Sequence, residues 1–155
     1  MSSDERKKRI FKRLKKKHGK EDALAILANM GHETGGTYDP KEKQKGGPAI
    51  GLIQWEGPRQ ENLLKRKNPL SMDTQLDFLD EELSTTERRN FNKVKKAGTV
   101  FDKTKAFSDF VERPGKPKMK RRMQVTDDLV GQGVVPYRRT SSKNLEEFNE
   151  EIKIL

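Results

Sequence analysis

The feature that most constrains this chain is an apolar helical segment that stops at glycines. Residues 23–30 (ALAILANM) are good helix formers with an apolar face, and Gly31, Gly35 and Gly36 follow within a few positions. Glu33 is therefore expected at or just beyond a helix C-terminus, where the helix dipole is negative and apolar neighbours exclude water. Both effects disfavour the ionised carboxyl. We predict that Glu33 stays protonated near neutral pH, as a general acid must.

A second segment, residues 49–55 (AIGLIQW), is apolar and β-prone, with glycine and proline on both sides. This pattern predicts a short hairpin-like segment that forms one wall of a cleft. The Gln54 amide can hydrogen-bond hydroxyls and acetamides, while the Trp55 indole either packs on a sugar ring or anchors the core. Gly51 would let a ligand or another backbone come close. Residues 34–48 would form the rim of a groove or only a mobile connection.

The rest of the chain contains the apolar spacings of amphipathic helices. They are expected over residues 4–18, 58–67, 72–84, 86–97, 100–112 and 117–130. Ser71 and Thr99 are expected to cap the helices that follow them. In the last helix, Arg122 is expected on the outer face with the neighbouring basic residues. The chain is therefore predicted to be mostly α-helical, with one modest core.

Four short motifs occur in a recognisable order: Glu33-Thr34, Tyr38-Asp39-Pro40, Ala49-x-Gly51-Leu52-Ile53-Gln54 and Trp55-x-Gly57-Pro58-Arg59. Together they resemble the phage tail lysozyme family of the lysozyme-like superfamily, whose relatives are lysozymes and lytic transglycosylases. The resemblance covers residues 20–131, including the run at residues 110–114. It implies a mostly α, lysozyme-like single helical domain with a short β-hairpin-like segment beside the active-site cleft. It also implies that the substrate is peptidoglycan.

The resemblance implies that Glu33 is the general acid of a muramidase, which cleaves the β-1,4 bond between N-acetylmuramic acid and N-acetylglucosamine. The identity of the second catalytic group stays open. The candidates are Asp39, which could equally be a turn residue, and Glu56. The third possibility is the acetamide of the substrate itself, as in lytic transglycosylases. Carboxyl groups about 5–5.5 Å apart would fit a retaining route, and about 6.5–9.5 Å an inverting one. The candidate substrate-binding residues are Tyr38, Gly51, Gln54 and Trp55.

The chain is divided into a basic N-terminal helix or arm at residues 1–19, a catalytic domain at residues 20–131 and a C-terminal extension at residues 132–155. The first 20 residues hold ten Lys or Arg against two acids. This helix either rests on the domain through Ile10 and Leu14 or contacts a polyanion or partner. The extension is either a loose end or a peptide that docks the enzyme to a larger assembly.

Composition narrows the chemistry. The 155 residues include no cysteine and only two histidines, which excludes disulfides and thiol chemistry and argues against a zinc site. No cofactor is expected. No apolar run approaches the ~20 residues of a transmembrane span, and the charged N-terminus lacks the apolar core of a secretory signal.

The resemblance, together with the missing secretory signal and the extra C-terminal tail, implies a virion protein of the phage tail that acts at the bacterial cell wall or periplasm during genome entry. A lysis-stage endolysin or a lytic transglycosylase is the nearby alternative. From another class, the net charge of +10 would suit a non-catalytic structural or nucleic-acid-binding virion protein. The expected partners are peptidoglycan and, through the termini, other tail or virion proteins. Nucleic acid is the less favoured partner.

Overall fold

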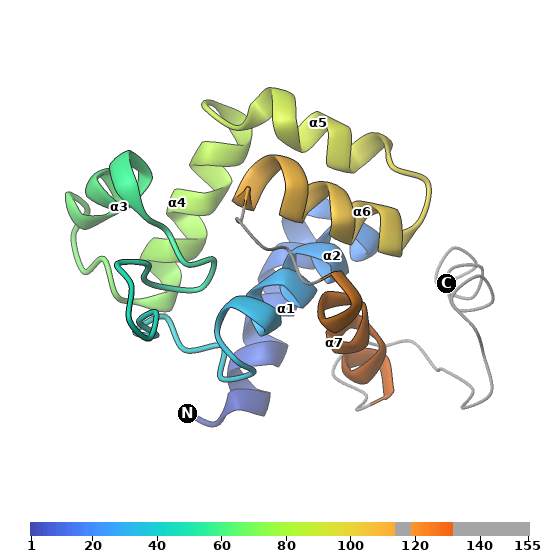
Figure 1. Ribbon diagram of the computed structural model, residues 1–155, viewed down its shortest axis with the longest axis horizontal. Coiled ribbons are helices and arrows are strands. Elements are labelled where there is room, and N and C mark those ends of the chain that lie inside the picture. The colour runs from blue at the N-terminus through green and yellow to red at the C-terminus, as the bar shows by residue number, and fades with distance from the viewer. Residues whose placement is uncertain (114–118, 132–155) are drawn as a thin grey trace.

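The computed structural model describes residues 1–113 and 119–131, which form a bundle of mostly short helices (Figure 1). The elements in chain order are α1 (Ser3–His18), α2 (Lys20–Glu33), α3 (Gly57–Leu64), α4 (Met72–Ser84), α5 (Arg88–Lys96), α6 (Val100–Ala106), the π-helix η1 (Phe107–Glu112) and α7 (Met119–Gly131). No β-sheet forms within the described residues, so the fold is mostly α, as predicted. The helix expected at residues 100–112 is divided into α6 and η1.

The central element is α2, which contacts α1, α6, η1 and α7 (Figure 1). All its residues from Ala23 to Gly31 are buried. Alanines and the terminal glycine keep this helix narrow, so its neighbours can pack closely on several sides. A helix surrounded in this way holds its C-terminal residue, Glu33, in a fixed place among its neighbours.

The basic helix α1 shares the core with α2. Its N-terminus is closed by a capping box, in which the Ser2 side chain accepts a hydrogen bond from the Glu5 backbone and the Glu5 side chain accepts one from the Ser2 backbone. Ile10, Phe11 and Leu14 are buried in the common cluster. The apolar face of this basic helix is therefore packed firmly against the rest of the domain.

The β-hairpin-like segment predicted beside the cleft is not supported. Isolated antiparallel bridges join Ile50 to Lys43 and to Trp55, and in this part of the chain no strand forms. The backbone φ angles are positive at two positions between Ile50 and Trp55, namely 85° at Gly51 and 56° at Gln54. These left-handed residues turn the chain back at once, so neither side extends into a strand.

A buried polar network attaches this turn region to the helices. The Trp55 indole N–H donates to Glu82 Oε1 at 2.9 Å. The Arg59 guanidinium donates to both oxygens of Glu82, at 2.7 and 2.9 Å, and to the Val111 carbonyl oxygen at 2.6 Å. The charge-assisted bonds of Arg59 therefore link α3 to α4 and to η1.

The predicted C-terminal docking extension lies outside the described residues, as do residues 114–118. Among the helices that the structure describes, none combines the length and the apolar character needed to cross a membrane.

Candidate active site

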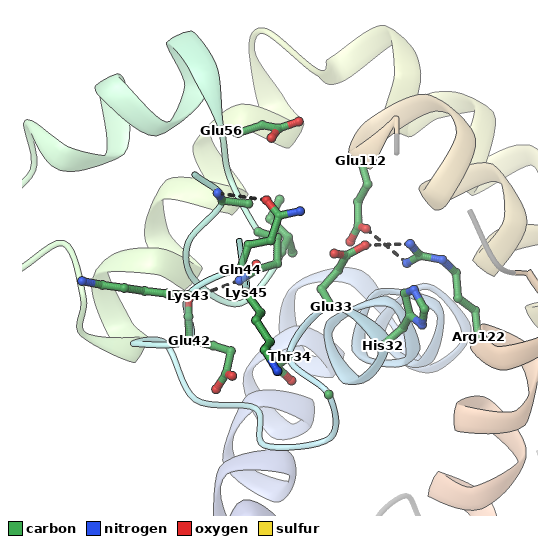
Figure 2. Close-up of a pocket in the computed structure, with 14 residues that line it drawn as sticks. His32, Glu33, Thr34, Glu42, Lys43, Gln44, Lys45, Glu56, Glu112 and Arg122 are labelled. Atoms are coloured by element: carbon green, nitrogen blue, oxygen red, sulfur yellow. Dashed lines mark hydrogen bonds and ion pairs between the residues drawn. The ribbon is translucent and has the colours of Figure 1, made fainter. Parts of the chain in front are cut away.

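An open pocket of about 470 Å³ lies at the C-terminal end of α2 (Figure 2). Its walls come from the end of α2, from the turns between residues 42 and 56, and from one residue each of η1 and α7. Most of the side chains that line it are charged groups or amides. Such a lining suits a polar ligand that needs many hydrogen bonds.

Glu33 lies where α2 ends at the pocket wall, and its side chain is 17% exposed. The next residue, Thr34, ends the helix: its hydroxyl donates to a carbonyl of the last helical turn at 2.8 Å and accepts from the Tyr38 backbone N–H at 2.9 Å. The Glu33 carboxyl points toward Glu112 and Arg122 (Figure 2). The expected position of Glu33 at the end of a helix is confirmed.

Arg122 of α7 connects the groups at this wall. One guanidinium nitrogen donates to Glu33 Oε1 at 2.6 Å, and the other donates to Asn29 Oδ1 at 2.6 Å and to Glu112 Oε2 at 3.2 Å. The side chain is 0% exposed, so the prediction that Arg122 lies on the outer face of its helix is wrong. The reason is that three acceptors, supplied by α2 and η1, compensate for its burial.

Asn29 fixes the orientation of this arginine. Its side-chain nitrogen donates to the carbonyl oxygens of Ala25, at 2.9 Å, and Thr104, at 3.2 Å. The amide oxygen must therefore face the opposite way, toward Arg122. Because Asn29 is fully buried on α2, it ties the guanidinium to the same helix that carries Glu33.

Glu112, the last residue of η1, places a second carboxyl beside Glu33 (Figure 2). Its side chain is 2% exposed, and Oε1 has no hydrogen-bond donor among the described residues. Burial raises the pKa of Glu112 well above its usual range, and so do the charge of Glu33 and a hydrogen bond to it, whereas Arg122 opposes the shift. Two carboxyl groups can hydrogen-bond to each other only when one of them keeps a proton.

Two of the residues considered from the sequence line the pocket with Glu33. Gln54 does so from a left-handed backbone conformation, and its side-chain nitrogen donates to the carbonyl oxygens of Glu42, at 3.2 Å, and Gly51, at 2.9 Å. Glu56 lines the pocket on the side opposite Glu33 (Figure 2). The structure therefore brings one amide and one further carboxyl to the pocket that holds Glu33.

Tyr38 and Asp39 are not among the residues that line this pocket. Tyr38 is 1% exposed, and burial, followed by the charge of Asp128, raises the pKa of its phenol. The Asp39 side chain accepts a hydrogen bond from the Lys41 backbone N–H at 2.9 Å, which is the geometry of an Asx turn. The catalytic role suggested for Asp39 and the substrate contact suggested for Tyr38 stay predictions.

Gly51 and Trp55 are also absent from the lining, and both are buried. A Cβ on Gly51 would lie 2.8 Å from Gln75 Oε1, so this glycine makes room for a side chain of the protein itself. The Trp55 ring meets Phe78 edge to face, with ring centroids 5.7 Å apart. Their substrate contacts stay predictions, and the geometry gives both residues a packing role.

Sequence reasoning did not identify Asn29, Glu112 and Arg122 as members of the site. The chain offers one weak signal: Arg122, Thr126 and Leu129 are spaced by four and three residues, and all are buried on α7. Only Leu129 is apolar, so hydrophobic spacing does not mark this face. Within the described ranges, no group of three or more metal-ligating side chains could hold an ion.

Comparison with known proteins adds one finding. Residues 5–130 match the family model described as Phage tail lysozyme. Neither the curated proteins nor the solved structures gave a match to the chain. The match includes every element from most of α1 to nearly the end of α7, and thus both carboxyl groups and the arginine described above.

Proposed function

The chain belongs to the phage tail lysozyme family, and on this premise we propose that it cleaves the β-1,4 bond between N-acetylmuramic acid and N-acetylglucosamine, with Glu33 as proton donor. Family membership indicates a phage-associated, lysozyme-like cell-wall hydrolase. The observation that carries the finer proposal is the carboxyl of Glu33, which stands at the wall of an open polar pocket and is held by a buried arginine.

Glycoside cleavage needs a proton for the leaving oxygen and stabilisation of an oxocarbenium-like centre. Glu33 is exposed enough to reach a substrate and buried enough to be held in one geometry. The Gln54 amide lies in the same pocket, where it can hydrogen-bond the acetamides of the sugar chain. These positions support a substrate that is bound across the end of α2.

The second catalytic group is open between three candidates. Glu56 lines the pocket opposite Glu33, which supports it as the group that activates a water molecule or stabilises positive charge. Asp39 stays a candidate only if the turn that holds it moves on binding. If neither acts, the acetamide of the substrate supplies the assistance, and the product carries an anhydro-muramic end where a sugar hydroxyl, as in lytic transglycosylases, takes the place of water.

The test of Glu33 is the clearing of outer-membrane-permeabilised cells or purified peptidoglycan. We expect Glu33→Gln to lower the rate by at least ~10² relative to wild type, because removal of a general acid has an effect of that size. Glu61→Gln is the matched control, since Glu61 is an exposed glutamate on α3. Equal clearing by wild type and Glu33→Gln, with both proteins folded, would remove Glu33 from this role.

The second group and the product need their own measurements. Glu56→Gln and Asp39→Asn should be assayed beside Glu33→Gln, and the carboxyl that acts is the one whose loss slows clearing. Mass spectrometry of the released muropeptides then separates the two chemistries. Reducing ends indicate hydrolysis, and anhydro-muramic ends indicate transglycosylation.

We further propose that the enzyme is carried in the phage tail and opens the wall locally during genome entry, while release at lysis is the alternative. The family description supports the first. Mass spectrometry of purified particles tests it, because a lysis-stage enzyme would be absent from them.

A non-catalytic polyanion-binding role is the second candidate, and one helix favours it. The exposed residues of α5 include five cations and no acid: Arg88, Arg89, Lys93, Lys95 and Lys96. Binding to DNA that weakens steeply with salt, in a protein that does not clear peptidoglycan, would support this role over the enzymatic one.

A further inference from the structure

The two carboxyl groups at the pocket wall share one positive partner. Glu33 and Glu112 both accept hydrogen bonds from Arg122, at 2.6 and 3.2 Å. Figure 2 shows the two carboxyl groups side by side in front of the guanidinium. Glu112 is the more deeply buried of the two, with 2% of its side chain exposed against 17% for Glu33.

Charge balance in this cluster favours one proton shared by the two carboxyl groups. If both carboxyl groups were ionised, Glu112 Oε1 would be a buried anionic oxygen with no donor in the part of the chain that the structure describes, beside a second anion. With one proton between them, the two carboxyl groups and the Arg122 guanidinium sum to zero charge. The oxygen that lacks a donor then takes part in a carboxyl–carboxylate hydrogen bond, an arrangement found where two acids share a site.

Among the described residues, the other cations near this cluster are exposed or already paired: Lys43 and Lys45 line the pocket as exposed side chains that water screens, and Arg59 lies near Glu112. Arg59 approaches it from α3 through its bond to the Val111 carbonyl oxygen, but its charge is already paired with Glu82. Glu82 and Glu87 surround Arg59 and add no positive charge. His32 lines the same pocket from α2.

We propose that Glu112 is a positioning residue for Glu33: its buried carboxyl holds the single proton of the pair and passes it to Glu33 through a hydrogen bond formed between the two carboxyl groups. This proposal rests on Glu33 being the proton donor of the reaction. It goes beyond that role because it assigns the protonation of Glu33 to a residue that is enclosed behind it. Burial and the neighbouring Glu33 raise the pKa of Glu112, which agrees with a proton kept there at neutral pH.

The proton can be followed through the reaction. In the resting pair Glu112 is protonated and Glu33 is a carboxylate that faces Arg122. Transfer along the hydrogen bond leaves Glu112 as the carboxylate, still paired with Arg122, and Glu33 as the acid. Glu33 then protonates the glycosidic oxygen as the bond to the sugar carbon breaks. The attacking water, or the sugar hydroxyl that closes an anhydro ring, returns one proton to the pair.

The first test does not depend on activity. Side-chain carboxyl carbons labelled with carbon-13 should show, in wild type at pH 7, one glutamate that remains protonated. This signal should be absent from Glu112→Gln and unchanged in the control Glu61→Gln. A wild-type spectrum in which every glutamate has lost its proton by pH 6 would overturn the proposal, whether or not the protein clears peptidoglycan.

The second test separates positioning from a purely structural effect. In Glu112→Gln the amide has no proton to pass to Glu33, so the basic limb of the pH–rate profile, which in wild type reports the loss of the proton held by the pair, should move to lower pH by about one unit or more. Near the acidic end of the profile the rate should approach that of wild type. A uniform loss of rate at every pH, with the limb unmoved, would overturn the proposal, as would an unchanged profile.

These outcomes are distinguishable from failure of the proposed function. If wild type does not clear peptidoglycan, the proposed function is wrong, and the carbon-13 measurement alone decides whether the pair holds a proton. If wild type clears, Glu33→Gln does not, and Glu112→Gln keeps the wild-type limb, only the role of Glu112 fails. Circular dichroism of each variant establishes that it is folded.

Discussion

Replacement of Arg122 by methionine is the most direct perturbation of the site. Methionine keeps a long unbranched side chain but provides no donor, so Asn29, Glu33 and Glu112 each lose a hydrogen bond from a group that is 0% exposed. Removal of one partner from a buried ion pair lowers the free energy of unfolding by about 3–5 kcal/mol. Since small domains have only about 5–15 kcal/mol in total, Arg122→Met is expected to be the most damaging single change at the pocket.

The measurement is urea unfolding followed by far-UV circular dichroism at neutral pH. The midpoint should fall with an unchanged m value, and Tm should fall by roughly 6–20 °C, which follows from about 2–4 °C per kcal/mol for a chain of this size. Arg121→Met is the matched control, because Arg121 is the exposed neighbour on the same helix and its replacement should change stability by no more than about 0.5 kcal/mol.

A double variant checks the mechanism of that loss. Arg122→Met combined with Glu112→Gln should lose less stability than the sum of the two single changes, with a coupling of about 0.5–3 kcal/mol, because the second change removes a buried acid that the first leaves without a partner. A loss below about 1 kcal/mol for Arg122→Met, or strict additivity in the double variant, would refute the argument that the guanidinium neutralises this cluster.

Three further outcomes follow from the same packing. Native Glu112 keeps a proton that the unfolded chain releases above about pH 4.3. The free energy of unfolding of wild type should therefore fall by up to about 1.4 kcal/mol per pH unit as pH rises toward the raised pKa of Glu112. Urea unfolding at several pH values should show this slope in wild type and not in Glu112→Gln. Gly31→Ala should destabilise the protein by about 1–3 kcal/mol despite a gain in helix propensity, because the added Cβ would collide with buried Tyr38. In the control Gly98→Ala the added Cβ meets nothing within 4 Å, so this variant should be neutral or stabilising in thermal melts. Trp55→Phe should lower the free energy of unfolding by about 1.5–3 kcal/mol, because it removes a hydrogen bond to a buried carboxylate, yet it should keep the clearing rate per folded molecule. A selective loss of clearing would instead favour a sugar contact.

Local chemistry explains why the helices could be predicted. Ser71 and Thr99 cap α4 and α6 as expected, through hydrogen bonds from backbone N–H groups three residues later. Glu33 could be predicted at a helix end for the same reason, since the glycines that follow it act locally. The tight turn at Gly51 and Gln54 was not predictable in this way, because β-prone residues around a glycine fit a strand and a tight turn equally well.

Long-range partners explain what was missed. Arg122 pairs with residues 89 and 93 positions earlier in the chain, and within α7 only its spacing from Thr126 and Leu129 distinguishes it weakly from the exposed Arg121. The sequence left two roles open for Trp55, a sugar contact or a core anchor. In the structure its indole N–H donates to Glu82, 27 residues away. A charged residue is buried only where distant acceptors meet it, and spacing within one helix carries no information on where they lie.

Two arginines bind the same end of η1, and these contacts give the Trp55–Arg59 run a structural role at the site. Arg59 donates to the carbonyl oxygen of Val111, and Arg122 donates to the side chain of the next residue, Glu112. The first arginine comes from the run that begins with Trp55, and the second holds Glu33. The position of the Glu112 carboxyl relative to Glu33 is therefore set from both sides, by α3 through Arg59 and by α7 through Arg122. A π-helical end to this segment fits such a role, since π-helical turns are frequent at functional sites.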